Sequence, residues 1–445
     1  MFLPHHILAC MDALENAGFA AYAVGGCVRD SLLGLTPHDY DLCTAATPTQ
    51  LRDVFSGYPL VLAGEKHGTV SVVIGTELVE ITTFRTEGGY QDSRHPDWVR
   101  FVSDIESDLS RRDFTVNAMA YSPYRGFADP FGGRNDLNIG ILRAVGDPHV
   151  RFTEDALRIL RGIRFSVRYR LQVAPETELA MTALAPQLDL LARERIFDEL
   201  CKLLPLISAD ELLRFAPIIA RIIPELQATL DFDQHSIHHA FDLFTHIAHV
   251  VQAVPPELPL RLAALLHDIG KPVTFYLDEK DSGHFPDHAK VGAQMADKVL
   301  LRLKAPTALR SQVVELIAQH MTPLEPDKRI LRRRLGKYGF SGTLALLALQ
   351  RADFSSKGTK ETTDLFDRVA GLIEQIQAEE ACLTVKNLAL NGHDLLQLGY
   401  APGPEIGRCL EHLLTCVQEE TLSNEREALL QKARSVLSCS AFRRK

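Results

Sequence analysis

The local pattern of the sequence changes at Asp147-Pro148, and this change limits the architectures that the chain can adopt. Before it, from Ala20 to about Gly146, short runs of β-branched residues such as 69–74 (TVSVVI) and 78–84 (LVEITTF) are separated by glycines and short helical segments. After it, apolar residues recur with helical spacing and strand patterns almost disappear. The sequence therefore predicts an α+β protein, with a mixed α/β domain first and helical domains behind it.

The length of 445 residues predicts about three domains at roughly 150 residues each. With 46% hydrophobic and 24% charged residues, the composition is that of a globular protein and excludes collagen, low-complexity disorder and a disulfide mini-protein. The formal net charge of −9 repels polyanions, so any contact with nucleic acid must come from local basic patches.

The sequence also bears on the compartment. No apolar run reaches the ~20 residues of a membrane helix, and the N-terminus lacks a basic segment and a cleavage site, so we expect a cytoplasmic protein with no membrane partner. The eight cysteines are scattered without a C-x-x-C pair, which is typical of buried thiols in a reducing compartment. The sequence does not indicate an oligomeric state.

Two motifs near the N-terminus predict a phosphate site and a metal site. Gly25-Gly26 lies between an apolar run and the start of a helix, where glycine backbone lets a phosphate approach, although a tight turn explains most isolated glycine pairs. Asp39 and Asp41 follow in an extended run and should project from one face. Paired carboxylates repel unless a cation holds them, and divalent cations that bind triphosphates prefer such oxygens. The combination favours nucleotidyl transfer over a solvated strand edge.

Two further clusters carry the cations that such a reaction needs. Arg111, Arg112, Asp113 and Asn117 surround a predicted helix start, where guanidinium groups can bind phosphates and Asp or Asn can bind a ribose hydroxyl; a surface charge run is the alternative. Further along, Asp155 and Arg158 are predicted on a helix whose arginines share one side and continue at Arg161 and Arg164. An ordinary Glu154–Arg158 surface pair is the simpler alternative for this second cluster.

In this order the segments resemble the bacterial-type, class II tRNA nucleotidyltransferases, or CCA-adding enzymes, and the related poly(A) polymerases. The resemblance runs from Tyr22 to about Glu199 and rests on GGCVRD with DYD, SRRDFTVNAMAY, DPHVR, EDALRILRGIRF and RERIFDE. It implies a polymerase-β-like head (1–146), a helical neck (147–230), and addition of CCA to tRNA from CTP and ATP. It also implies that Asp39 and Asp41 hold the catalytic Mg²⁺ and that the nucleotide is bound by Gly25, Gly26, Arg29, Arg111, Arg112, Asp113, Asn117, Asp155, Arg158, Arg161 and Arg164.

The resemblance makes Asp155 and Arg158 a protein template for the incoming base, and hydrogen-bond chemistry supports this role. An Asp acceptor at the exocyclic amine and an Arg donor at the neighbouring ring nitrogen suit both cytosine and adenine. Guanine and uracil present a carbonyl to the Asp, which leaves a polar group without a partner. By its position, Glu80 is predicted as a third carboxylate near the metals.

Residues 85–96 are polar, contain two glycines and show no periodicity, so we expect a mobile loop. Members of the family carry a flexible loop at this place that is associated with the final A addition, and relatives that add only CC lack it. Its presence argues against a CC-only enzyme and leaves full CCA addition and A-only addition open.

A histidine-rich region follows the neck. The dipeptide His-Asp occurs three times, but only His267-Asp268 ends an apolar helix, predicted over 260–266. A single buried histidine is usually a hydrogen-bonded core residue. Several on separate helices can instead converge on one metal, and the candidates are His246, His267, Asp268 and Asp353, with His288 and His320 as outer candidates. His235, His238, His239 and His249 leave the first ligand ambiguous, and we choose His246 by its spacing.

This pattern resembles the HD phosphohydrolase superfamily. It implies a domain over 231–360 that binds a divalent transition metal or Mg²⁺ and acts as a 2′,3′-cyclic phosphodiesterase, 2′-nucleotidase or phosphatase. The last segment, 361–445, resembles the helical tail that holds tRNA in related enzymes, where Lys386, Arg408 and the terminal Arg443-Arg444-Lys445 supply positive charge; His393 and Asp394 are predicted to be structural.

The sequence thus predicts a CCA-adding enzyme with an additional phosphohydrolase activity. The alternative within the same class is an A-adding enzyme or a poly(A) polymerase. The alternative from another class is a nucleotide phosphohydrolase whose head only binds nucleotide. The intact Asp39/Asp41 pair disfavours this last reading.

Overall fold

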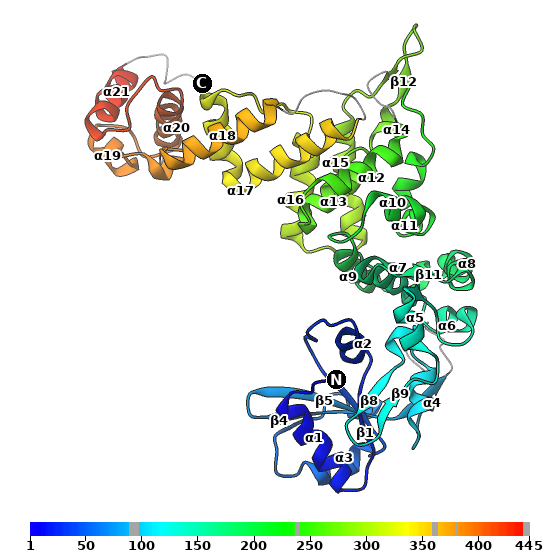
Figure 1. The fold of residues 1–445 in the computed structure, drawn as a ribbon. Helices are drawn as coiled ribbons and strands as arrows, with labels where there is room; N and C mark the ends of the chain where they lie inside the picture. Colours follow the sequence, from blue (N-terminus) through cyan, green and yellow to red (C-terminus); the bar gives the residue numbers. More distant parts are fainter. Residues whose placement is uncertain (89–97, 236–240, 358–363, 380, 439–445) are drawn as a thin grey trace. The chain divides into compact units, whose positions relative to one another are not determined.

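The computed structural model describes residues 1–88, 98–235, 241–357, 364–379 and 381–438 (Figure 1). It contains two compact units. The N-terminal unit comprises residues 1–227 and 301–305, and the C-terminal unit comprises residues 228–300 and 306–445. Within the described ranges, no helix is long and apolar enough to cross a membrane.

A seven-stranded mixed sheet forms the core of the first part of the N-terminal unit. Its strands lie in the order β3 (Leu60–Val61), β4 (Thr69–Ile74), β5 (Glu77–Thr83), β2 (Asp41–Thr44), β1 (Ala21–Val24), β8 (Ala120–Ser122) and β9 (Gly126–Ala128). Within this sheet, only the pair β2–β5 is parallel, and the other neighbouring strands are antiparallel. Because Leu42 lies opposite Ile81 in this pair, the register places Asp41 beside Glu80 at the start of β2.

Short helices surround this sheet: α1 (His5–Asn16), α2 (Gly26–Leu32), α3 (Pro48–Val54), α4 (Ile105–Ser110) and α5 (Gly133–Asn138), with the 3₁₀ turns η1 (Glu65–His67) and η2 (Thr115–Asn117). In Figure 1, α1 and α3 lie along one face of the sheet. Buried Val24, Cys43, Phe84 and Leu109 belong to one apolar cluster of this domain. The mixed α/β character predicted for the N-terminal segment is confirmed.

The prediction of a loop over 85–96 is partly wrong. Residues 85–88 form strand β6 (Arg85–Gly88), which pairs antiparallel with β7 (Trp98–Phe101). Because the pairing partner lies beyond the glycines, a local search for periodicity missed it. Residues 89–96 of the predicted loop lie outside the described residues.

The remainder of the N-terminal unit is mostly helical: α6 (Pro148–Glu154), α7 (Leu157–Tyr169), α8 (Pro175–Leu184), η3 (Ala185–Leu190), α9 (Arg193–Leu203), α10 (Ala209–Arg214), α11 (Ala216–Ile222) and η4 (Pro224–Thr229), of which η4 ends in the C-terminal unit. A short parallel pair, β10 (Ile141–Leu142) and β11 (Gln172–Val173), accompanies them.

The single helix predicted to carry Asp155 and Arg158 is two helices. Asp155 has extended backbone angles (φ −147°, ψ 101°) and separates α6 from α7. Its carboxylate accepts the backbone N–H of Leu157 at 3.0 Å. A short acidic side chain can replace a backbone hydrogen bond in this way, which explains the break.

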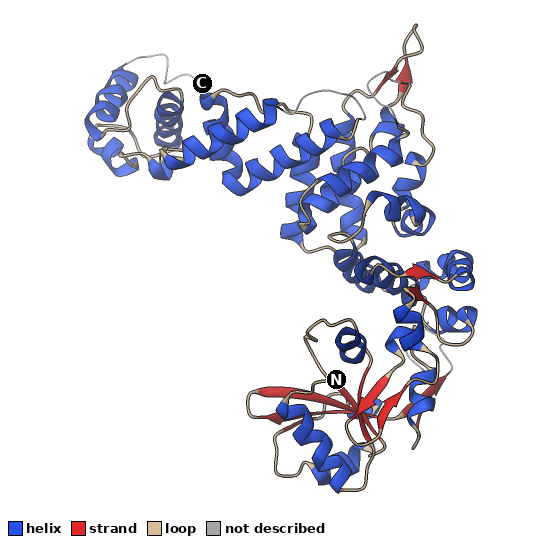
Figure 2. Ribbon diagram, viewed as in Figure 1, coloured by secondary structure: helices blue, strands red, loops and turns tan. Residues whose placement is uncertain are grey.

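Among the described residues, the C-terminal unit is helical apart from one hairpin, β12 (Tyr276–Leu277) and β13 (Gly283–His284) (Figure 2). Its first helices are α12 (Leu243–Ala253), α13 (Leu258–Leu266), α14 (Lys271–Thr274), α15 (His288–Arg302), α16 (Thr307–Gln319) and α17 (Lys328–Ser355). Helices α12, α13, α16 and α17 pack against one another. This bundle and the start of α15 hold the predicted metal ligands.

The chain then continues through α18 (Asp364–Ala378), η5 (Val385–Asn387), α19 (Gly392–Gln397), α20 (Pro404–Gln418) and α21 (Arg426–Ser438). Leu395, Cys409, Leu413 and Leu429 form part of a separate apolar core here. His393 and Asp394 lie in the first turn of α19, and Asp394 pairs with Arg426 at 2.6 Å. This contact agrees with the structural role predicted for them.

Candidate functional sites

An open pocket of about 670 Å³ lies in the N-terminal unit, and we call it the arginine pocket. The residues predicted to bind nucleotide in this unit all line it, together with Asp39 and Asp41, whereas Glu80, predicted as a third carboxylate near the metals, does not. The predicted residues that line it come from the β1–α2 turn, the segment leading into β2, the segment between α4 and η2, and helix α7 with the break before it: Gly25, Gly26, Arg29, Asp39, Asp41, Arg111, Arg112, Asp113, Asn117, Asp155, Arg158, Arg161 and Arg164.

The β1–α2 turn requires a glycine at position 25. Gly25 has φ +71°, in the left-handed region, and its N–H donates to the carbonyl of Met119 at 3.0 Å. A Cβ atom there would lie 2.7 Å from Nη1 of Arg112. Glycine therefore lets a guanidinium group approach the turn from which α2 begins.

The paired carboxylates do not share a strand as predicted. Asp41 is the first residue of β2, whereas Asp39 lies in the segment before it. They are nevertheless close enough to interact: partial burial and the negative charges of Asp39 and Glu80 raise the pKa of the Asp41 carboxyl, against the effect of Arg112. Carboxylates that repel one another in this way fit a hard divalent cation.

A carboxylate that the sequence analysis did not assign orients the two adjacent arginines. Asp108 is 1% exposed and accepts hydrogen bonds from Nη2 of Arg111 at 2.9 Å and from Nη2 of Arg112 at 3.4 Å. Despite the opposing effect of burial, these two cations lower the pKa of Asp108. Nε of Arg112 is buried and has no hydrogen-bond partner among the described residues, so it is available to an anionic ligand.

Asp113 is engaged by protein groups on both of its oxygens. Oδ2 accepts Nε and Nη2 of Arg161 at 2.8 and 2.7 Å, and Oδ1 accepts Nδ2 of Asn117 at 3.0 Å. Burial opposes ionisation, but the charge of Arg161 and these hydrogen bonds lower the pKa of Asp113 to about 2. Asp113 therefore holds Arg161 and Asn117 in place.

Arg29 is engaged in a similar way. Its guanidinium group donates to Asp30 at 2.7 and 2.9 Å and also bonds to Asn117 and the hydroxyl of Tyr169. It lies 4.2 Å from the centroid of the Tyr169 ring. Arg29 thus joins α2 to α7 while it lines the pocket.

The predicted template residues are held from both sides of the helix break. Oδ2 of Asp155 is 2.8 Å from Nη2 of Arg195 on α9. Nη1 of Arg158 is 2.7 Å from Glu154, and its Nη2 donates to the carbonyl of Arg111 at 3.0 Å. The Glu154–Arg158 pair expected as the simple alternative is therefore present, and Arg158 also lines the pocket.

Arg195 lines the pocket too, and its Nη1 is buried without a hydrogen-bond partner in the part of the chain that the structure describes. The sequence analysis noted its motif, RERIFDE, but gave this arginine no role. The other lining residues that were missed are Asp30, His38, Leu157, Phe165, Arg168 and Tyr169. Arg168 lies four residues after Arg164, a spacing that keeps it on the same side of the helix, and this was the signal for that residue.

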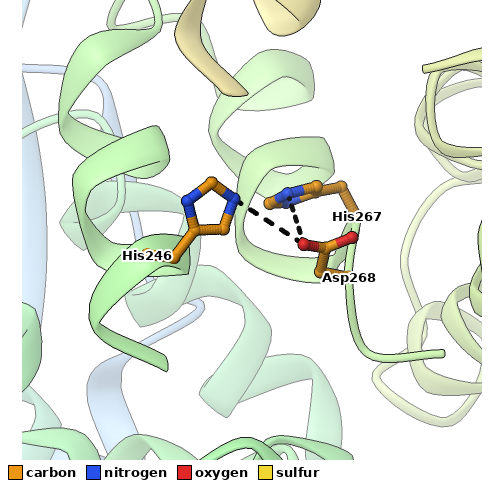
Figure 3. A group of neighbouring side chains, drawn as sticks. All are labelled: His246, His267 and Asp268. Carbon is orange, nitrogen blue, oxygen red and sulfur yellow. Dashed lines mark ion pairs between the residues drawn. The ribbon is translucent and has the colours of Figure 1, made fainter. Parts of the chain in front are cut away.

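The C-terminal unit brings the predicted metal ligands together in what we call the histidine centre. His246 lies on α12, His267 and Asp268 follow α13, and Figure 3 shows the three side chains facing one another. Nε2 of His267 is 3.2 Å and Nε2 of His246 is 3.7 Å from Oδ2 of Asp268. Asp353, on α17, places Oδ1 3.1 Å from Nε2 of His246.

The two outer candidates also belong to this centre. Nε2 of His288 and of His320 lie 3.5 and 3.8 Å from Oδ1 of Asp268. Two groups of possible ligand atoms result, one from His246, His267 and Asp268 and one from Asp268, His288 and His320, each with its atoms within 4.8 Å of one another. Asp268 therefore offers one oxygen to each group.

The hydrogen bonds of these histidines fit metal binding. Nδ1 of His267, His288 and His320 bonds to a backbone carbonyl at 2.8, 2.8 and 2.7 Å. Their Nε2 atoms are buried with no hydrogen-bond partner among the residues described, and a carbonyl on one nitrogen directs the other nitrogen at a metal. Burial and the nearby His267 lower the pKa of His320 to about 4, which keeps it neutral as a ligand must be.

Of the other candidates for the first ligand, His235 is partly exposed and packs near the ring of Phe275, and the ring of His249 packs at a tilt against that of Phe241, with centroids 4.9 Å apart. His238 and His239 lie outside the described residues. The sequence analysis missed Lys271, whose Nζ is 2.7 Å from Oδ2 of Asp268. The described cysteines form no disulfide, and Cys439 lies outside them.

Comparison with known protein families identifies three domains in this chain. The family model of the poly A polymerase head domain matches residues 21–143, that of the probable RNA and SrmB-binding site of polymerase A matches 170–230, and that of the HD domain matches 237–354. Among curated proteins, the CCA-adding enzyme of Latilactobacillus sakei is 31% identical over 436 residues, covering 96% of this chain and 97% of the relative.

Other relatives extend along almost the whole chain. The CCA-adding enzyme of Streptococcus pneumoniae strain R6 is 32% identical over 434 residues, covering 95% of each chain. The crystal structure of the Bacillus stearothermophilus CCA-adding enzyme in complex with CTP is 27% identical with a TM-score of 0.69, covering 98% of each chain. The Thermotoga maritima CCA-adding enzyme complexed with tRNA, at 21% identity and a TM-score of 0.61, shares the fold.

Proposed function

The chain belongs to the CCA-adding enzymes, the tRNA nucleotidyltransferases, and on this premise we infer that the arginine pocket is where it joins CTP and ATP to the 3′ end of tRNA. The observation that carries this assignment is the convergence of Asp39, Asp41 and all the residues predicted to bind nucleotide on one pocket. Buried guanidinium nitrogens of Arg112 and Arg195 without hydrogen-bond partners among the described residues support an anionic ligand there.

We propose that Asp39 and Asp41 hold the divalent cation, and that this cation is Mg²⁺. When bound, it neutralises charge on the triphosphate and on the attacking and leaving oxygens. Arg112, oriented by buried Asp108, binds phosphate oxygens next to the glycine turn. Arg161, fixed by Asp113, adds a second cation whose position does not depend on the ligand.

Asp155 and Arg158 supply the base template in this proposal. The ion pair with Arg195 and the hydrogen bond from Leu157 fix the Asp155 carboxylate. Glu154 and the Arg111 carbonyl fix the Arg158 guanidinium group. A rigid acceptor–donor pair selects cytosine and adenine, because guanine and uracil would leave a polar atom of the pair without a partner.

We further propose that tRNA is the nucleic-acid partner and that the chain is divided as the sequence predicts, into a head (1–146), neck (147–230), HD domain (231–360) and tail (361–445). The printed description of the Thermotoga maritima relative, complexed with tRNA, supports the partner. Lys386 and Arg408 of the tail are proposed phosphate contacts, while Arg443, Arg444 and Lys445 lie outside the described residues.

Incorporation of labelled CTP and ATP into a tRNA that lacks its CCA end tests this function. We expect addition of two C residues and one A, dependent on Mg²⁺. Addition of A alone to an acceptor ending in CC, with no use of CTP, would instead identify an A-adding enzyme, and an extended A tail would identify a poly(A) polymerase.

A second function is proposed for the histidine centre, which fits metal-dependent hydrolysis of phosphoesters. The buried Nε2 atoms of its histidines and the Asp268 carboxylate shared by two ligand groups support this function. His246, His267, Asp268 and Asp353 would hold one divalent ion, and Asp268, His288 and His320 a second. Such ions, when bound, polarise the phosphoryl group and activate water. Hydrolysis of 2′,3′-cyclic nucleotides, 2′-nucleotides and p-nitrophenyl phosphate with Mn²⁺, Ni²⁺, Co²⁺ or Mg²⁺ tests it.

A further inference from the structure

A β-hairpin lies between Lys271 and His288, two residues whose side chains contact Asp268 of the histidine centre. Lys271, 2.7 Å from Asp268, begins α14, and His288, 3.5 Å from Asp268, begins α15. Between them β12 and β13 pair antiparallel, with Tyr276 opposite His284 and Leu277 opposite Gly283. Both ends of the hairpin are therefore attached to residues of the centre.

Aromatic rings at the base of the hairpin connect it to the centre. Phe275 and Phe285 precede and follow the paired strands, with ring centroids 5.6 Å apart, and Phe275 packs edge-on against Phe232 at 5.2 Å. Nζ of Lys271 lies 5.2 Å from the centroid of the Phe285 ring. This packing gives the base of the hairpin a defined position next to the metal ligands.

Backbone contacts hold the second strand as well. The N–H of Gly283 donates to the carbonyl of His235 at 2.8 Å. A Cβ atom at position 283 would lie 2.1 Å from the carbonyl oxygen of Gln234. The side chain of Gln234 in turn accepts a hydrogen bond from Nζ of Lys271 at 2.9 Å. Glycine therefore allows the strand to run directly over a residue that contacts the centre.

The pair of strand residues next to the base of the hairpin presents two exposed rings. The ring of Tyr276 stacks on that of His284, with centroids 5.2 Å apart and an interplanar angle of 21°, yet Tyr276 is 52% exposed. Nε2 of His284 is 2.9 Å from Asp278, whose other carboxylate oxygen accepts the backbone N–H groups of Lys280 and Ser282 at 2.8 and 2.9 Å. A hairpin with two paired residues in each strand is marginal alone, so these bonds keep the exposed rings in one arrangement.

We propose that Tyr276, backed by His284, is a stacking platform for the nucleobase of the substrate of the histidine centre. The inference rests on the phosphohydrolase function proposed above and assigns its substrate class as phosphoesters that carry a base. One face of the Tyr276 ring is covered by His284, and a base can stack on the other. Such stacking tolerates any base, and a platform held rigid before binding loses little entropy when the base arrives.

The reaction assigned to such a substrate is simple hydrolysis. For a 2′,3′-cyclic nucleotide, the oxygen of water forms a bond to phosphorus and one bridging P–O bond breaks. One proton of the water ends on the released ribose oxygen, and the other remains on, or dissociates from, the new phosphate oxygen. No electrons are exchanged and no co-substrate other than water is needed.

The full-length protein loaded with Mn²⁺ allows the platform to be tested with three substrates that share the same reacting group. These are 2′,3′-cyclic AMP, a short RNA that ends in a 2′,3′-cyclic phosphate, and methyl riboside 2′,3′-cyclic phosphate, which has no base. We expect Tyr276→Ala to raise KM about tenfold for the two substrates with a base and to leave the base-free substrate unchanged. Comparison of the first two substrates identifies the source of the base as a free nucleotide or an RNA end.

Two matched variants serve as controls. Tyr276→Phe keeps the ring and should retain the wild-type KM. Leu277→Ala removes an exposed side chain from the next position of the same strand, which points to the opposite side, and should also leave KM unchanged. Addition of CCA should be the same in all these proteins. An equal effect of Tyr276→Ala on all three substrates, or no effect on any, would overturn the platform.

Binding of 2′,3′-cyclic AMP to the Mn²⁺-loaded protein, measured by equilibrium dialysis in the presence of excess CTP, separates the platform from the hydrolysis. If wild type binds but does not hydrolyse, and Tyr276→Ala weakens binding about tenfold, the platform stands and the proposed hydrolysis is wrong. If wild type neither binds nor hydrolyses any of the three substrates, the platform is wrong as well.

Discussion

Asp155 and Arg195 form an ion pair at 2.8 Å although 40 residues separate them along the chain. The pair fixes one carboxylate oxygen of Asp155, and the N–H of Leu157 fixes the other at 3.0 Å. Arg195 thereby connects α9 to the break between α6 and α7. In the proposed template, it positions the group that distinguishes the bases.

This arrangement predicts that Arg195→Ala and Asp155→Ala have similar effects. Both should relax the choice of base, as should Arg158→Ala, because each frees part of the template. We expect incorporation of GTP and UTP relative to CTP and ATP to rise about 10- to 100-fold, with smaller changes in KM for the correct triphosphates. Lys202→Ala, an exposed change on the same helix as Arg195, is the control. Undiminished discrimination in the Asp155 and Arg158 variants would refute the template.

A second prediction concerns the carboxylates near the start of β2. Asp39→Ala and Asp41→Ala should each abolish nucleotide addition, because one remaining carboxylate no longer holds the cations that stabilise the transferring phosphate. Hydrolysis at the histidine centre should continue. Glu77→Ala, at the exposed start of β5, controls for loss of surface charge, and thermal melting controls for folding. CTP incorporation close to the wild-type rate in both aspartate variants would show that the assignment is wrong.

The pair between Asp113 and Arg161 predicts a pH dependence of stability. The folded-state pKa of Asp113 is about 2, below its usual value of 3.8. A lowered carboxyl pKa stabilises the fold above pH ~4, and the stabilisation is lost as the pH falls toward 2. Asp113→Asn should therefore lower the free energy of unfolding by about 2 kcal/mol at pH 7.

Urea unfolding followed by circular dichroism at pH 7, 5, 4 and 3 measures this difference. The difference in the free energy of unfolding between wild type and Asp113→Asn should stay constant from pH 7 to 5 and become smaller below pH 4. A difference that becomes larger as the pH falls would contradict the ion-pair explanation.

The sequence was sufficient to predict thirteen of the residues that line the pocket, since each motif keeps its members within a few positions. It was not sufficient for Asp108 and Arg195, because a carboxylate or arginine is assigned a role only when its distant partner is known. The break at Asp155 was missed because apolar spacing continues through the segment while one side chain replaces a backbone hydrogen bond. The pairing of β6 with β7 depends on strands separated by glycines and polar residues, which local periodicity does not reveal.

A fourth prediction separates the two activities. His267→Ala with Asp268→Ala should abolish metal-stimulated hydrolysis and reduce the bound metal, because Asp268 contributes to both groups of ligand atoms. His320→Ala should remove one metal and retain the other. Metal content measured by plasma mass spectrometry, together with assays of hydrolysis and of CCA addition, tests both statements. Addition of CCA should persist in every variant. Unchanged metal content in the double variant would show that the histidines are packing residues and not metal ligands.

The most direct test of the arginine pocket as the CCA-adding site is to sequence the 3′ ends made on tRNA acceptors that end before the CCA, after the first C and after the second C. With CTP and ATP together, the wild-type protein should complete all three to CCA and stop, whereas Asp41→Ala should extend none. Failure of the wild type to incorporate C, or unchanged completion by Asp41→Ala, would contradict the assignment.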